Sequence, residues 1–153
     1  MGLKFIVFVV NCFLVQKVLS DKFVEGFFDN ADVVCENKIG LSRADFNSFY
    51  NKEMLIIHPD NELVRDYMKC WSYEKELTDA DGLLNENNLK HWIKTEVFHY
   101  IGKDDLDEYP MRSRDTPADL IYDYCKKEVG IGFYMEGKDN YFYNCVMNNI
   151  EAL

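Results

Sequence analysis

Four cysteines spread along the chain constrain its fold more than any other feature. They are Cys35, Cys70, Cys125 and Cys145, and a fifth, Cys12, lies within the first twenty residues. An even set of cysteines forms disulfides in an oxidising compartment, whereas in a reducing one it more often binds metal or carries out redox chemistry. The compartment therefore decides how these cysteines are interpreted.

The first twenty residues indicate that compartment. Lys4 supplies a positive charge, and residues 5–15 form an almost unbroken apolar run. Residues 18–20 then place small or short side chains at the −3 and −1 positions of a signal-peptidase site. This pattern is typical of a secretory signal peptide, and the apolar run is too short to span a bilayer. An N-terminal anchor or a buried helix is the alternative. We expect residues 1–20 to be a signal peptide and residues 21–153 to be one secreted, extracellular domain.

Removal of the signal peptide changes the cysteine count and the charge. Cys12 is lost, and the net charge falls from −10 to −12 because residues 1–20 contain two lysines and no acid. A chain this acidic repels nucleic acid and anionic membrane surfaces, so we expect neither as a partner. No later stretch approaches the ~20 apolar residues of a transmembrane helix, so no stable membrane insertion is expected.

Apolar residues recur at helical spacing in about six segments, and no segment alternates like a strand. Gly40 is placed to end the first segment, and a capping box at 42–45 is placed to begin the second. Asp79–Gly82 reads as a turn, Thr116-Pro117 as a helix start, and the glycines at 130–137 as a break. The sequence predicts an all-α fold. The apolar stripes cover residues 24–35, 46–50, 63–71, 89–101, 118–129 and 142–150.

The four cysteines fall on four different predicted helices, the first, third, fifth and sixth. Four cysteines allow three pairings, and the sequence alone does not choose among them. Pairing 35 with 70 and 125 with 145 is the simplest for sequential antiparallel helices. Each such bridge would stabilise the fold by roughly 3–4 kcal/mol.

Residues 66–82 carry a resemblance to a known family. Asp-Tyr-Met-Lys-Cys-Trp at 66–71, then Glu-Lys at 74–75 and Thr-Asp-Ala-Asp-Gly at 78–82, are similar to the segment around the second and third cysteines of insect odorant-binding proteins. That family has six cysteines on six helices, with three residues between the second and third and eight between the fifth and sixth. On this spacing Asp66 and Glu136 occupy the second and fifth positions. The absence of both members of one bridge resembles the family's four-cysteine, or C-minus, branch.

The resemblance covers essentially the whole of residues 21–153 and implies both a structure and a function. It implies bridges 35–70 and 125–145 and a helical shell around an apolar cavity. The implied function is that of a carrier, which reversibly binds a small hydrophobic ligand such as an odorant, a pheromone or a lipid-like molecule. A membrane receptor is a further partner to consider, and the oligomeric state is left open.

The aromatic and methionine content suits an adaptable apolar pocket, since aromatics make up 15% of the chain. Met68 and Trp71 are the first candidates for its wall, because they share a helix face turned slightly away from Cys70. The alternative for each candidate is that it only fills the core. The remaining candidates for ligand binding are Trp92, Val97, Phe133, Tyr134 and Phe142.

Asp66 and Glu136 are candidates for a pH-sensitive pair. If the helices keep the family's spacing, two carboxylates stand where a disulfide would hold its carbons roughly 4 Å apart. Like charges that close raise the pKa of one carboxyl, so ligand release would depend on pH. The alternative is that both side chains turn into solvent and do nothing.

No motif for catalysis, metal binding or a cofactor is present, and we expect the protein not to be an enzyme. His58, His91 and His99 lack metal-ligand spacing, and no nucleophile motif occurs. Two alternatives to the carrier remain. One is a salivary-type scavenger of biogenic amines or lipids, which would need a buried acid in the pocket, with Glu96 or Asp123 as candidates. The other is a secreted protein-interaction module without a ligand cavity.

Overall fold

The computed structural model describes residues 27–103 and 116–150, and the expected signal peptide lies outside them. Within these ranges the backbone is helical apart from loops and three isolated β-bridges, which confirms the predicted all-α class. The helices are α2 (Asn30–Ile39), α3 (Arg43–Asn47), α4 (Glu62–Glu74), α5 (Glu86–Trp92), η1 (Ile93–Val97), α6 (Phe98–Tyr100), α7 (Pro117–Val129) and α8 (Asp139–Ile150).

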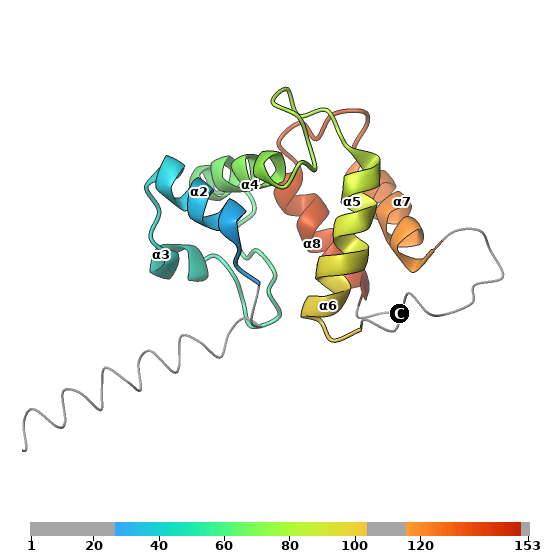
Figure 1. The fold of residues 1–153 in the computed structure, drawn as a ribbon, viewed down its shortest axis with the longest axis horizontal. Helices are drawn as coiled ribbons and strands as arrows, with labels where there is room; N and C mark the ends of the chain where they lie inside the picture. Colours follow the sequence, from blue (N-terminus) through green and yellow to red (C-terminus); the bar gives the residue numbers. More distant parts are fainter. Residues whose placement is uncertain (1–26, 104–115, 151–153) are drawn as a thin grey trace, which may run out of the picture.

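The helices form two groups with α8 between them (Figure 1). Helices α2, α3 and α4 make one group, and α7 makes the other with α5, η1 and α6, which run on as one continuous helix. The Cys35–Cys70 disulfide joins α2 to α4, and the Cys125–Cys145 disulfide joins α7 to α8. This is the pairing that the resemblance implied. One bridge therefore cross-links the first group within itself, and the other joins the second group to α8.

Local capping explains where the helices begin and end. Helix α2 starts at Asn30, later than the predicted apolar stripe, because Asp29 caps it in a capping box with Asp32. Gly40 ends α2 with a φ of +75°, a left-handed conformation that favours glycine. A second capping box, formed by Thr116 and Asp119, begins α7 as predicted.

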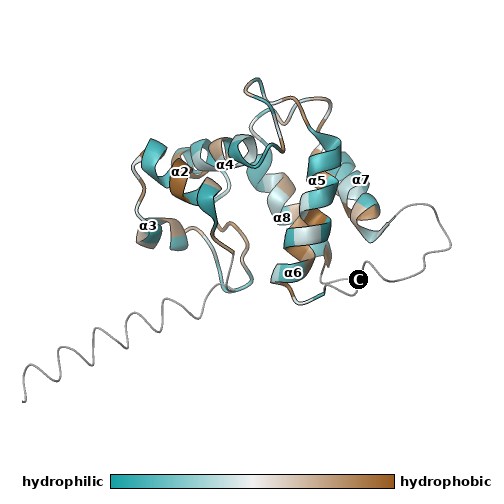
Figure 2. Ribbon diagram, viewed as in Figure 1, coloured by the Kyte–Doolittle hydropathy of each residue, from teal (hydrophilic) through white to brown (hydrophobic). Residues whose placement is uncertain are grey.

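The helix that runs from α5 to α6 changes character along its length. Figure 2 shows hydrophilic residues over its first turns and hydrophobic residues further along. Its middle, η1, is a π-helical turn in which the Phe98 N–H donates to the Ile93 carbonyl, five residues earlier. Because such a turn brings residues i and i+5 nearer to one face, Trp92 and Val97 can both face the interior.

Helix α8 fastens the loop between α3 and α4 through side-chain amides. The Asn144 side chain accepts from the Ile56 N–H and donates to the Ile56 carbonyl, both at 2.8 Å. Asn140 donates to the Pro59 carbonyl, and the Tyr143 hydroxyl donates to the Met54 carbonyl. These contacts hold the loop against the interior and so fix the position of Tyr50 at its start.

Candidate ligand pocket

An enclosed pocket lies in the interior, and both helix groups and α8 contribute to its wall. Among the described residues that line it, Asp32 is the one with a charged side chain, and the others are mainly aromatic or methionine. The cavity has a volume of about 20 Å³, which is room for about one water molecule. The wall consists of Phe27, Asp32, Tyr50, Tyr67, Met68, Trp71, Trp92, Val97, Tyr100, Tyr143 and Met147.

Four of the seven residues predicted to bind ligand meet at this pocket. Met68 and Trp71 line it from α4, where a spacing of three residues puts them on one helix face. Trp92 and Val97 line it from the end of α5 and from η1. The Trp71 and Trp92 rings meet edge to face at 5.6 Å between centroids. Two consecutive helices thus bring their predicted residues to one site.

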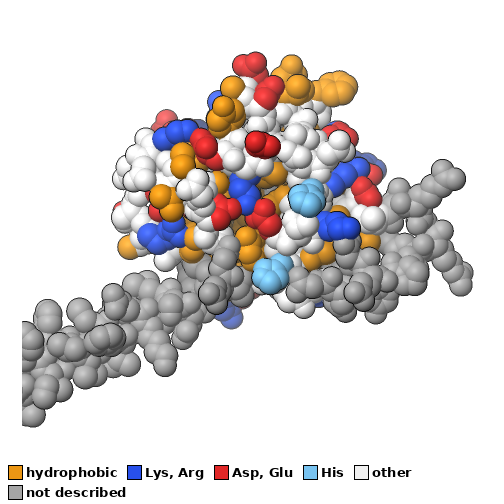
Figure 3. Space-filling model, in the orientation of Figure 1, with side chains coloured by type: hydrophobic (Ala, Val, Ile, Leu, Met, Phe, Trp, Pro, Cys, Tyr) orange, Lys and Arg blue, Asp and Glu red, His pale blue; other side chains and the backbone are white. Residues whose placement is uncertain are grey.

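The other three predicted residues lie elsewhere. Phe133 is 80% exposed and Tyr134 is 47% exposed, on the loop between α7 and α8. That loop pairs with the α4–α5 loop, because the Leu84 N–H donates to the Phe133 carbonyl and the Met135 N–H to the Gly82 carbonyl. Figure 3 shows hydrophobic side chains gathered on this upper edge of the molecule. Phe142 is buried in α8, and its ring packs against Tyr122 at 6.0 Å rather than lining the pocket.

Sequence reasoning missed the polar side of the pocket. Four tyrosines line it together with Asp32. Tyr50, Tyr67 and Tyr143 are buried, and Tyr100 is partly exposed. The sequence carried no signal for these tyrosines, since it does not distinguish a buried tyrosine from a surface one. Asp32 did carry one: it precedes Cys35 by three residues, which places a carboxylate on the buried face of α2.

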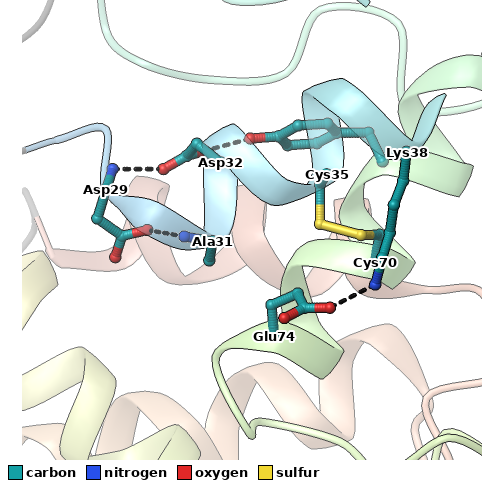
Figure 4. Close-up of a disulfide and its surroundings, with 8 residues drawn as sticks. Asp29, Ala31, Asp32, Cys35, Lys38, Cys70 and Glu74 are labelled. Atoms are coloured by element: carbon teal, nitrogen blue, oxygen red, sulfur yellow. Dashed lines mark hydrogen bonds and ion pairs between the residues drawn. A yellow bond between two sulfur atoms is a disulfide. The ribbon is translucent and has the colours of Figure 1, made fainter. Parts of the chain in front are cut away.

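Asp32 is held in the interior by two hydrogen bonds. It is 3% exposed. Its Oδ1 accepts from the Tyr67 hydroxyl and its Oδ2 accepts from the Asp29 N–H at 2.7 Å. Figure 4 shows this arrangement about one turn before Cys35 and the Cys35–Cys70 bridge. Burial raises the pKa of Asp32 to about 6, although the two hydrogen bonds and the charge of Arg43 act in the opposite direction.

A lysine bridge lies beside the pocket. The Lys75 ammonium at the end of α4 contacts the Asp29 carboxylate at 2.6 Å and the Glu96 carboxylate at 2.5 Å. It also lies 5.8 Å from the centre of the Trp71 ring. Burial lowers the pKa of Lys75, but the bonds to Asp29 and Glu96 outweigh it and leave the pKa raised. The bridge thus links α2, α4 and η1 around one end of the pocket.

The four acidic residues that the sequence singled out, two for an amine site and two for a pH-sensitive pair, lie in different parts of the structure. Glu96 accepts from Lys75 and from the Tyr100 hydroxyl, so it belongs to the lysine bridge, while Asp123 is exposed on α7. Asp66 and Glu136 are both exposed. Glu136 stands in the left-handed region with a φ of +54°. No hydrogen bond or ion pair between described residues joins Asp66 to Glu136, so their pH-sensitive pairing stays a prediction.

No metal site, membrane span or similar protein was found for the described part of the chain or for its sequence. Across residues 27–103 and 116–150, no group of three or more His, Cys, Asp or Glu side chains is arranged to hold a metal ion, and His58, His91 and His99 are exposed. None of the helices in these ranges has the length and apolar character needed to cross a membrane. The sequence matches no family model, and no curated protein or solved structure matches it either.

Proposed function

We propose that this chain is a secreted, non-enzymatic carrier that reversibly binds a small hydrophobic ligand in the internal pocket. The observation that carries the proposal is the convergence of Met68, Trp71, Trp92 and Val97 on one enclosed, aromatic-rich site. A site lined by apolar side chains with a few polar groups is the usual form of a small-molecule pocket. The described residues that line the pocket include no Ser, Thr, Cys or His side chain that could act as a nucleophile, so binding is the function that this lining supports best.

The disulfide framework supports the same proposal. Two bridges, 35–70 and 125–145, suit an oxidising, extracellular setting. They are also the bridges that the four-cysteine odorant-binding proteins would keep if Asp66 and Glu136 replace the third pair. We therefore propose membership of that family together with the carrier function.

The small cavity means that the wall has to move when a ligand enters. A volume of about 20 Å³ is far below the ~300 Å³ of typical ligand pockets. Met68 and Met147 are suited to give way, because an unbranched thioether changes rotamer easily. Burial of ten methylenes contributes about 8 kcal/mol, which sets a lower limit of about 1 μM on the dissociation constant, and the costs of association weaken binding from there.

Displacement of a fluorescent probe tests the carrier function. We expect N-phenyl-1-naphthylamine to bind and to be displaced by alkanes, esters or aromatics. Met147→Ala enlarges the pocket and should raise the affinity for the probe about threefold or more. Met135→Ala is the matched control, since Met135 is equally buried but lies outside the pocket wall. Failure of the probe to bind would overturn the proposal and favour the protein-interaction module, whose contact surface would include the exposed Phe133.

Asp32 favours a second candidate function, the binding of a biogenic amine. A buried carboxylate among aromatic rings can pair with an ammonium group and surround it with π faces. Near the pocket, Asp29, Asp32 and Glu96 outnumber Lys75. The charge of Arg43 also acts on Asp32, but Arg43 is paired with Glu36, so a cationic ligand would restore the balance.

The affinities of tryptamine and of its uncharged analogue indole-3-ethanol decide between the two candidates. An amine site predicts that tryptamine binds at least tenfold more tightly and that Asp32→Asn abolishes the difference. Asp119→Asn is the control, since Asp119 has the same place in the other capping box. Equal affinities would leave the apolar carrier and exclude the amine scavenger.

A further inference from the structure

Trp92 carries a buried hydrogen-bond donor that the fold leaves unused. The residue is 4% exposed, and its indole Nε1–H has no acceptor among the residues that the structure describes. A buried donor without an acceptor costs about 1–3 kcal/mol, enough that folded proteins seldom keep one. The wall of the pocket therefore contains a group suited to an acceptor brought from outside.

The surroundings of the Trp92 ring belong to the pocket. Trp92 itself lines the cavity, and its ring neighbours are Trp71 at 5.6 Å and Tyr143 at 6.2 Å, which also line it. The ring is anchored at the junction of α5 and η1, so its position is set by the helix backbone. Because the ring borders this cavity, we take the cavity as the route by which an acceptor reaches Nε1–H.

The hydroxyls of the same wall already have acceptors. Tyr67 donates to Asp32, and Tyr143 donates to the Met54 carbonyl at 3.0 Å. Tyr50 donates to the Met68 sulfur at 3.7 Å, and Tyr100 donates to Glu96 at 3.2 Å. The fold thus supplies acceptors for the phenols but none for the Trp92 indole, which makes Nε1–H the donor available to a ligand.

The charges near the pocket restrict what that acceptor can be. Asp32 lines the cavity, and Asp29 and Glu96 flank it, with Lys75 as their shared counter-ion. A carboxylate ligand would meet this excess of negative charge in a low-dielectric site, which is unfavourable. An uncharged oxygen accepts one hydrogen bond from an indole without that penalty.

We propose that Trp92 is a specificity-determining residue of the pocket, whose Nε1–H receives a single uncharged oxygen acceptor of an otherwise apolar ligand. Ketones, aldehydes, esters, ethers and alcohols share this chemistry, whereas alkanes lack the acceptor and fatty-acid anions carry a charge. The inference rests on the proposed carrier function and narrows its ligand class.

Three eight-carbon compounds test the preference by displacing N-phenyl-1-naphthylamine, a probe without oxygen. We expect 2-octanone to displace it about tenfold more effectively than octane at equal free concentration, as one satisfied buried donor predicts. Octanoate should be the weakest of the three. Trp92→Phe keeps an aromatic ring but removes the donor, so the preference for the ketone should fall to about twofold or less.

Trp71→Phe is the matched control, because Trp71 lies in the same wall and undergoes the same change. It should alter the affinity for both compounds while leaving the preference for the ketone near tenfold. The chain contains two tryptophans, so a ¹⁵N-labelled sample gives two indole signals that the two variants assign. The Trp92 signal should move on addition of 2-octanone and stay in place on addition of octane.

The outcomes separate this inference from the proposed function. If 2-octanone and octane displace the probe equally, or if the preference survives Trp92→Phe, the role of Trp92 is wrong while the carrier function stands. A Trp92 indole signal that does not respond to the ketone also contradicts it. If the probe itself does not bind, the carrier function fails and the inference fails with it.

Discussion

The two cross-linked helix pairs of this molecule are built in contrasting ways. The Cys35–Cys70 bridge closes a loop of 35 residues and lies beside the buried Asp32, its tyrosine partner and the pocket. The Cys125–Cys145 bridge closes only 20 residues. Apolar side chains such as Ile121, Phe142 and Val146 are buried on the same two helices, and the Asn149 amide donates to Cys145 on the outer side.

This difference suggests that one helix pair supports the fold and the other responds to pH and ligand. The buried carboxyl of α8, Asp139, bonds to Ser72 of α4 and not to α7. The α7–α8 interface itself is packed by apolar side chains and serves as a frame. The α2–α4 pair instead encloses a carboxyl whose pKa is raised to about 6 and ends in the lysine bridge of Lys75. Changes in pH or ligand can act on the α2–α4 pair while the α7–α8 interface keeps its form.

Removal of each disulfide is the strongest test of this contrast. Loop entropy predicts that Cys35→Ala with Cys70→Ala lowers the free energy of unfolding by about 4 kcal/mol, and Cys125→Ala with Cys145→Ala by about 3 kcal/mol. Urea denaturation measures both. The first variant should also lose affinity for the probe, since Asp32 is carried by the released α2. Retained affinity in the first variant would contradict the assignment of the pocket to this pair.

Truncation of a large core side chain gives the next largest loss of stability. Phe142→Ala should destabilise the protein by about 3 kcal/mol through the cavity it leaves. Because Phe142 packs in the α7–α8 frame and not in the pocket wall, the folded fraction should bind the probe with unchanged affinity. A change in probe affinity larger than threefold would show that the packing between α7 and α8 is transmitted to the pocket wall, to which α8 contributes Tyr143 and Met147.

The buried carboxyl makes stability depend on pH in the α2–α4 pair. The folded-state pKa of Asp32, about 6, lies above its ordinary value of 3.8, so the folded protein binds more protons than the unfolded chain between these values. The free energy of unfolding should therefore fall as pH rises from about 4 to about 6, by on the order of 2 kcal/mol.

Asp32→Asn should remove most of that fall, as thermal unfolding at several pH values would show. A smaller dependence of the same sign remains from Asp139, whose pKa burial also raises. Asp29, with a lowered pKa, acts below this range and with the opposite sign. An unchanged pH profile in Asp32→Asn would contradict the assignment.

The lysine bridge gives the smallest expected effect. Lys75→Met should cost about 1 kcal/mol, since it breaks contacts with two carboxylates in a partly buried place. It should also speed probe release in stopped-flow measurements, because α2 and η1 lose their shared link beside the pocket. Lys126→Met, which breaks the more exposed pair with Glu86, is the control and should leave release unchanged.

The fold was largely predictable because its determinants are local. Helix periodicity, the capping boxes and the glycine at position 40 depend on residues a few positions apart, and they located the helices. The start of α2 was predicted too early. Phe27 and Phe28 continue the helical spacing of apolar residues, but the Asp29 cap begins the helix only at Asn30. The disulfide pairing was open from spacing alone and needed the helices to be placed beside one another.

The sequence by itself determined the all-α class, the cysteines available for cross-linking and four wall residues of the pocket, because each depends on composition or helical phase. Only the tertiary structure decided that Phe133 and Tyr134 lie outside while Asp32 and four tyrosines line the interior. It also left the Trp92 indole without an acceptor. Such outcomes depend on which helix faces meet, and contacts between residues tens of positions apart leave no periodic trace in the sequence.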